Sequence, residues 1–135
     1  MYYMLEDPIA TMLGDWSSEL GAGAIIFRII ISIIFSAIIG CERSIKRHSA
    51  GLRTFILVSL ASTIAMLIDL YLMQDFGVVF AFLSTATIIS TAMLSGNSIL
   101  FTSKNQIKGL TTSVGLWTAG IIGLSIGAGL YTVTT

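Results

Sequence analysis

The sequence predicts an all-α polytopic membrane protein, in which four transmembrane helices form two hairpins behind a short N-terminal amphipathic helix. Three observations support this. Of the 135 residues, 55% are hydrophobic and only 10% are charged, whereas soluble domains average about 45–50% apolar and about 25% charged residues. Four long stretches are nearly free of charge, each close to the roughly 20 residues that cross a hydrocarbon core. Basic residues also gather at one end of these stretches.

Residues 1–23 form the N-terminal segment and predict an amphipathic helix lying on the membrane surface. Asp7 followed by Pro8 is typical of a helix start. Apolar residues then fall on one face of the helix, namely Ile9, Met12, Leu13, Trp16 and Leu20. Because the opposite face is acidic, we expect this helix on the outer surface. Gly21 and Gly23 form a hinge after it.

Residues 24–135 form the transmembrane domain, with helices expected at about 24–41, 52–72, 78–95 and 110–133. Backbone groups in lipid must be hydrogen-bonded within the segment, which favours helices. Six of the seven basic residues fall at one side of these helices, namely Arg43, Lys46, Arg47, Arg53, Lys104 and Lys108. The positive-inside rule therefore predicts that both hairpin loops are cytoplasmic and both termini face outward.

Small residues recur at every fourth position in the last two helices. One ladder contains Thr87, Thr91 and Ser95, and the other contains Gly115, Ala119, Gly123 and Gly127. Such ladders let helix backbones approach closely in lipid. Packing within the chain is favoured, and homodimerisation is the alternative. The residues 51–54 and 109–112, Gly-Leu-Arg-Thr and Gly-Leu-Thr-Thr, also echo each other, as a parallel repeat or shared helix-start chemistry would produce.

The sequence contains no phosphate-binding glycine loop, zinc-ligand spacing or nucleophile elbow, so we expect neither an enzyme nor a cofactor. Candidate functional residues instead lie at the cytoplasmic ends of the helices, and we call them the cytoplasmic rim. They are Glu42, Arg43, Gly51, Arg53, Thr54, Asn97, Lys108, Gly109, Thr111 and Thr112. Helix N-termini beside basic side chains suit an anion or a lipid headgroup. A large side chain at Gly51 or Gly109 is expected to crowd the neighbouring helix.

Two charges lie inside the apolar stretches, Arg28 in the first and Asp69 in the second. At 1.5 Å per residue, both lie roughly 21 to 22 Å from the cytoplasmic end. The matched depths predict a structural ion pair, and separate snorkelling to the outer headgroups is the alternative.

Two separated motifs resemble the N-terminal membrane domain of the MgtC/SapB family. The first includes Gly40, Glu42 and Arg43 followed by residues 50–54, and the second runs from Lys104, Asn105 and Gln106 to Tyr131. The resemblance covers about residues 24–131. The chain departs from the family in residues 90–97, which replace a glycine-rich run, and at Phe82 and Ala86, where members commonly have arginine and glutamine. It also stops before the fifth helix and C-terminal domain, as a divergent, minimal or truncated member would.

The resemblance implies a bacterial inner-membrane protein connected with magnesium homeostasis and virulence. Our first hypothesis is a non-enzymatic regulator that contacts membrane lipid and other membrane proteins, without nucleic acid. The second is a small magnesium, cation or solute transport component acting as a homo-oligomer. A transport path needs polar groups near the midplane. The last three helices offer only serine, threonine and Asn97 there, which favours the first hypothesis.

Overall fold

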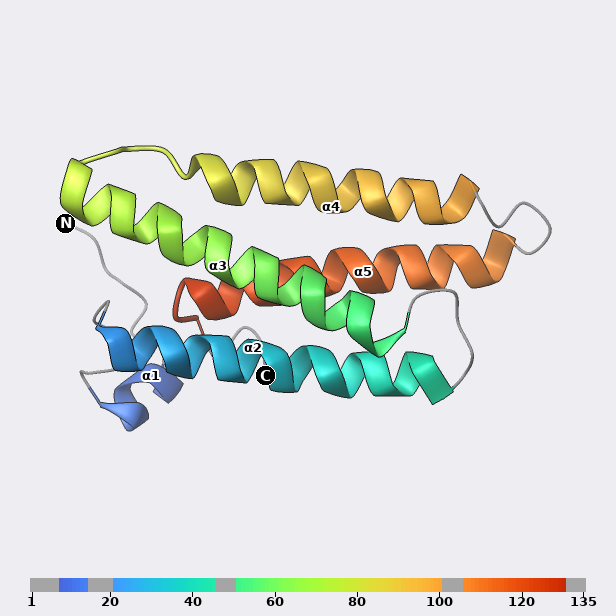
Figure 1. Cartoon of the computed structure of the whole chain (residues 1–135), viewed down its shortest axis with the longest axis horizontal. Coiled ribbons are helices and arrows are strands. Elements are labelled where there is room, and N and C mark those ends of the chain that lie inside the picture. The colour runs from blue at the N-terminus through green and yellow to red at the C-terminus, as the bar shows by residue number, and fades with distance from the viewer. Residues whose placement is uncertain (1–7, 15–20, 46–50, 101–105, 131–135) are drawn as a thin grey trace.

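The computed structural model describes residues 8–14, 21–45, 51–100 and 106–130, apart from the side chains of 10–11, 97–100 and 106–110. Helices are the only regular secondary structure in these residues, which confirms the all-α fold class (Figure 1). The helices are α1 (Pro8–Leu13), α2 (Ala22–Ile45), α3 (Leu52–Phe76), α4 (Phe82–Leu100) and α5 (Gln106–Gly127).

Glycines with positive φ end three of the helices and correct the expected boundaries. Gly14 (φ 93°) stops α1, so that helix is shorter than the sequence predicts, and Trp16 and Leu20 lie outside the described residues. Gly77 (φ 62°) ends α3. Gly129 (φ 82°) ends α5 before the predicted residue 133, and the Leu130 N–H donates to the Ser125 carbonyl in a Schellman turn.

The four long helices form a bundle in which α3 and α5 are the central pair, and α2 and α4 pack against this pair (Figure 1). These two run in parallel, because Phe55 approaches Gly115 at one end and Met66 approaches Gly127 at the other. Helix α2 packs antiparallel on α3, and α4 packs beside α5. Helices α2 and α4 lie on opposite sides, and their described residues do not touch. The pattern of neighbouring helices stays the same when the hairpin α2–α3 is exchanged with the hairpin α4–α5. A parallel repeat, one of the two explanations for the similar helix starts, would produce such a pattern.

Polarity is inverted relative to a water-soluble bundle. The buried faces of α2 and α3 carry mainly small and hydroxyl side chains, including Ser32, Ser36, Ser59, Ser62 and Thr63. Large apolar side chains point outward, such as Ile38 (63% exposed) and Met93 (67% exposed). This arrangement suits lipid, where close packing rather than hydrophobic burial joins helices. Helices α2 and α3 are long and apolar enough to cross a membrane, whereas the apolar parts Phe82–Gly96 and Thr111–Gly127 are shorter.

Candidate functional site

The glycine ladder of α5 brings its backbone against α3. A Cβ at Gly123 would collide with the Ser59 carbonyl oxygen, and a Cβ at Gly127 would lie 2.9 Å from the Thr63 carbonyl oxygen. Ala119, between them and Gly115 on the ladder, is fully buried. On the other side of α5, a Cβ at Gly120 would lie 3.0 Å from the Thr91 methyl group. The ladder is thus used for packing inside the chain.

A hydroxyl cluster joins α2, α3 and α5 at the same level. The Thr63 hydroxyl lies 2.7 Å from the Ser32 hydroxyl and 2.9 Å from the Gly123 carbonyl oxygen. The Ser32 and Ser59 hydroxyls are 2.9 Å apart. Because one hydroxyl has one hydrogen and several acceptor positions, the cluster can be satisfied internally. These side chains therefore connect three helices without leaving a polar group exposed to lipid.

The two charges within the apolar helices have separate partners. The Arg28 guanidinium donates a 2.8 Å hydrogen bond to the Gly127 carbonyl, at the C-terminal end of α5. The Asp69 carboxylate accepts hydrogen bonds from the backbone N–H groups of Leu83 (3.1 Å) and Ser84 (2.6 Å). Those N–H groups belong to the first turn of α4, where no carbonyl of the helix itself can accept them. Each charge therefore lies at the helix end of opposite polarity.

This arrangement replaces the expected Arg28–Asp69 ion pair, which the structure does not form. The prediction compared only how deep Arg28 and Asp69 lie along their helices. It did not consider the direction in which each side chain points around its helix axis. Thr63 faces Ser32 and α5, and Asp69 follows it by six residues, which is about 120° around the helix at about 100° per residue. The rotation turns Asp69 away from α2 and towards α4. Its two hydrogen bonds also explain why α4 begins at Phe82 rather than near residue 78.

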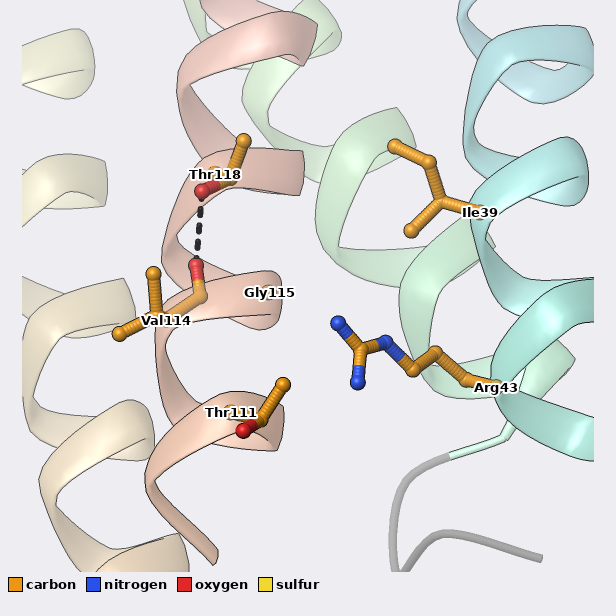
Figure 2. Close-up of a pocket in the computed structure, with 6 residues that line it drawn as sticks. All are labelled: Ile39, Arg43, Thr111, Val114, Gly115 and Thr118. Atoms are coloured by element: carbon orange, nitrogen blue, oxygen red, sulfur yellow. Dashed lines mark hydrogen bonds between the residues drawn. The ribbon is translucent and has the colours of Figure 1, made fainter. Parts of the chain in front are cut away.

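At the opposite end of the bundle, part of the cytoplasmic rim lines a groove between α2 and α5 (Figure 2). The groove has a volume of about 430 Å³. It is lined by Ile39, Arg43, Thr111, Val114, Gly115 and Thr118. Figure 2 shows the half-buried Arg43 side chain reaching from α2 towards α5. Gly115 lies beside both Arg43 and Phe55: a Cβ there would be in ordinary contact with the Arg43 Nε atom, at 3.9 Å, and tight against the Phe55 ring, at 3.3 Å.

Among the rim residues whose side chains the structure describes, several do not line this groove. Glu42, Arg53 and Thr54 are exposed, and Thr112 is buried within the bundle. Gly51 precedes α3 with extended backbone, and a Cβ there meets no atom within 4 Å. A small side chain at Gly51 would therefore not crowd a neighbouring helix, and the expected effect of a large one stays a prediction. The side chains of Asn97 and Lys108, together with the surroundings of Gly109, lie outside the described residues.

Sequence reasoning missed a third ladder, on α2. Its buried residues recur every fourth position, namely Ala24, Arg28, Ser32, Ser36 and Gly40. A Cβ at Gly40 would lie only 2.9 Å from the Leu52 Cα atom, so α2 and the start of α3 touch through their backbones. The signal was available, because small or polar residues at this spacing interrupt a run rich in isoleucine.

The inverted polarity, the backbone contacts and the two helices long enough to cross a membrane indicate a helical membrane protein with a groove at one end. A family model described as MgtC family matches residues 29–135, and the chain belongs to this family. This confirms the resemblance found in the sequence.

Relatives support the same assignment. The chain is 30% identical over 112 residues to the protein named "Putative magnesium transporter YhiD" of Escherichia coli K12, covering 78% of this chain and 52% of that protein. It is 28% identical to protein SapB of Bacillus subtilis (79% and 49% covered) and 27% identical to protein MgtC of Salmonella typhimurium (78% and 44% covered). The chain thus spans about half the length of these relatives. No solved structure matches it.

Proposed function

We propose that this protein is a non-enzymatic membrane regulator that acts by contacting other membrane proteins when magnesium is scarce. The observation that carries the proposal is the contact between α3 and α5, where Gly123 brings the two backbones together in the middle of the bundle. A centre closed by backbone atoms supports a protein that binds partners over one that conducts ions through a single chain. The large apolar side chains exposed on α2 and α4 offer surface for such contacts.

The proposal includes a membrane placement. All four long helices cross the bacterial inner membrane, with both hairpin loops in the cytoplasm and both termini outside. The distribution of basic residues supports this orientation. The exposed apolar side chains on α4 and α5, for example Met93 and Val114, support spans by these two helices as well.

A second candidate function is an oligomeric transport component for magnesium, another cation or a solute. The name of the relative YhiD favours it. On α4, the hydroxyl groups of Thr85 and Ser90 are exposed and bond only to their own helix backbone. In an assembly of several copies, such side chains would line a shared path.

Magnesium flux distinguishes the two candidates. Purified protein is reconstituted into liposomes that enclose a magnesium-sensitive dye, and protein-free liposomes serve as the baseline. A regulator leaves the rate of magnesium entry at the baseline. Uptake that exceeds the baseline, and that calcium does not reproduce, would overturn the proposal in favour of transport. Replacing Ser90 by Leu should then reduce the uptake if α4 lines the path.

A further inference from the structure

Helices α2 and α5 are close at one end and separate at the other. The hydrogen bond from Arg28 to the Gly127 carbonyl joins them where α5 ends. Towards the end of α2 that carries Arg43, they separate and the groove opens between them (Figure 2). Phe55 of α3 lies behind the groove, because its ring is the nearest neighbour of a Cβ placed on Gly115. The groove is therefore an opening on the side of the bundle, with a closed floor.

The groove changes from polar to apolar along its length. Arg43 lies two residues before the end of α2, with Thr111 across from it on α5. One turn further into the bundle, Ile39 of α2 and the methyl group of Thr118 on α5 make the lining apolar (Figure 2). Val114, 55% exposed, borders the groove with its side chain turned away from Ile39. Within the described part of the chain, the Arg43 guanidinium has no hydrogen bond or ion pair. A cation above an apolar slot is thus available to a ligand.

We propose that this groove binds one anionic phospholipid, with the phosphate on Arg43 and the upper part of an acyl chain against Ile39 and the methyl group of Thr118. Guanidinium groups form strong charge-assisted hydrogen bonds with phosphate. The apolar walls open sideways, to the surface that faces lipid, so the occupant carries a hydrocarbon chain beside its charge. The inference rests on the membrane placement proposed above and on neither of the two candidate functions.

Trp117 reports on lipid beside this part of α5, because it lies three residues after Val114 and 44% of its surface is exposed. The chain has two tryptophans, so Trp16→Phe leaves Trp117 as the single reporter. This protein is reconstituted into phosphatidylcholine vesicles. Bromine atoms on an acyl chain quench tryptophan at short range. Quenching by brominated phosphatidylglycerol is compared with quenching by brominated phosphatidylcholine, which has no net charge.

We expect phosphatidylglycerol to be preferred by about three- to tenfold, as one charge-assisted contact with a partly exposed cation allows. Arg43→Gln should abolish this preference. Arg53→Gln is the matched control, since it removes one exposed basic side chain at the same end of the bundle and should keep the preference. Thr118→Phe retains Arg43 but fills the groove, and should also reduce the preference. Circular dichroism verifies that each variant is folded.

Three results would overturn the inference. Equal loss of preference in Arg43→Gln and Arg53→Gln would show that general surface charge attracts the lipid. Displacement of brominated phosphatidylglycerol by inorganic phosphate alone would show a site for a free anion. Absence of quenching by either brominated lipid would refute the membrane placement itself. Magnesium flux plays no part in these measurements, so they stand apart from the choice between regulator and transporter.

Discussion

The Arg28 guanidinium on α2 is hydrogen-bonded to the Gly127 carbonyl oxygen on α5, 99 residues further along the chain, at a distance of 2.8 Å. The arginine is 3% exposed, so its charge is removed from solvent. The last carbonyls of a helix carry a partial negative charge, which compensates the cation. Asp69, 2% exposed, has the converse position at the N-terminus of α4. Both buried charges thus fix the end of a neighbouring helix.

This relationship predicts that the two charges act independently. Arg28→Leu and Asp69→Leu should each lower the free energy of unfolding by about 1–3 kcal/mol, because each leaves backbone groups at a helix end unsatisfied. The double variant should lose about the sum, since the hydrogen-bond partners described for Arg28 and Asp69 lie on different helices, α5 and α4. Unfolding in mixed micelles of increasing SDS fraction measures all three. A double variant no less stable than either single variant would instead indicate a direct ion pair.

Gly40 and Gly51 form a matched pair near the cytoplasmic rim. Gly40→Ala should destabilise the bundle by about 1–3 kcal/mol, because the added methyl group would strike the backbone of Leu52. Gly51→Ala should be nearly silent, since that position is open. Folded yield in detergent, measured by size-exclusion chromatography, compares them. Equal damage by both substitutions would mean that glycine is needed at the rim for another reason.

The α3–α5 contact can be tested in the same way. Gly123→Ala should cost about 1–3 kcal/mol or prevent folding, because its methyl group would collide with the Ser59 carbonyl oxygen. Gly96→Ala serves as the control: no atom lies within 4 Å of its Cβ position, and alanine favours a helix by up to about 1 kcal/mol. SDS unfolding monitored by circular dichroism reports the difference. A Gly123→Ala protein as stable as Gly96→Ala would contradict the backbone contact.

The sequence predicts the helices well because long apolar runs and small-residue spacing are local signals. The glycine ladder from Gly115 to Gly127 is a clear case, since it packs inside the chain as favoured. The start of α4 depends instead on Asp69, which is 13 residues before Phe82 in sequence and becomes its cap only after the helices pack. Sequence alone gives the depth of a charge in the membrane but leaves its direction to the packing of neighbouring helices.

The candidate site shows the same limit. Arg43 and Thr111 stand out in the sequence as rim residues, yet only the structure brings them to one groove and leaves Arg53 and Thr54 outside it. The opening exists because α2 diverges from α5 after their contact at Arg28. No spacing in either helix encodes that divergence, since it depends on where Phe55 and Gly115 place the three helices relative to one another.

The hydroxyl cluster makes a further prediction. Thr63→Val keeps the shape of the side chain but removes the hydroxyl between Ser32 and the Gly123 carbonyl. We expect a loss of about 1–2 kcal/mol, the cost of leaving buried partners without a hydrogen bond. Thr85→Val is the control, because its hydroxyl bonds only to its own helix on the exposed side of α4. SDS unfolding should rank them clearly, and equal stability would show that water or neighbouring groups replace the Thr63 hydroxyl.

Membrane orientation is open to direct labelling. In a Cys41→Ser background, which removes the single native cysteine, new cysteines are placed one at a time at Ser49, Gln74 and Gln106. We expect an impermeant thiol reagent to label Gln74→Cys in intact cells, after permeabilisation of any outer membrane, and to spare the other two. The reason is that six of the seven basic residues cluster with Ser49 and Gln106, and such clusters remain in the cytoplasm. All three should react once the inner membrane is opened, which proves that each site is accessible. Labelling of Ser49→Cys in cells with an intact inner membrane would reverse the topology and place the Arg43 groove in the outer leaflet.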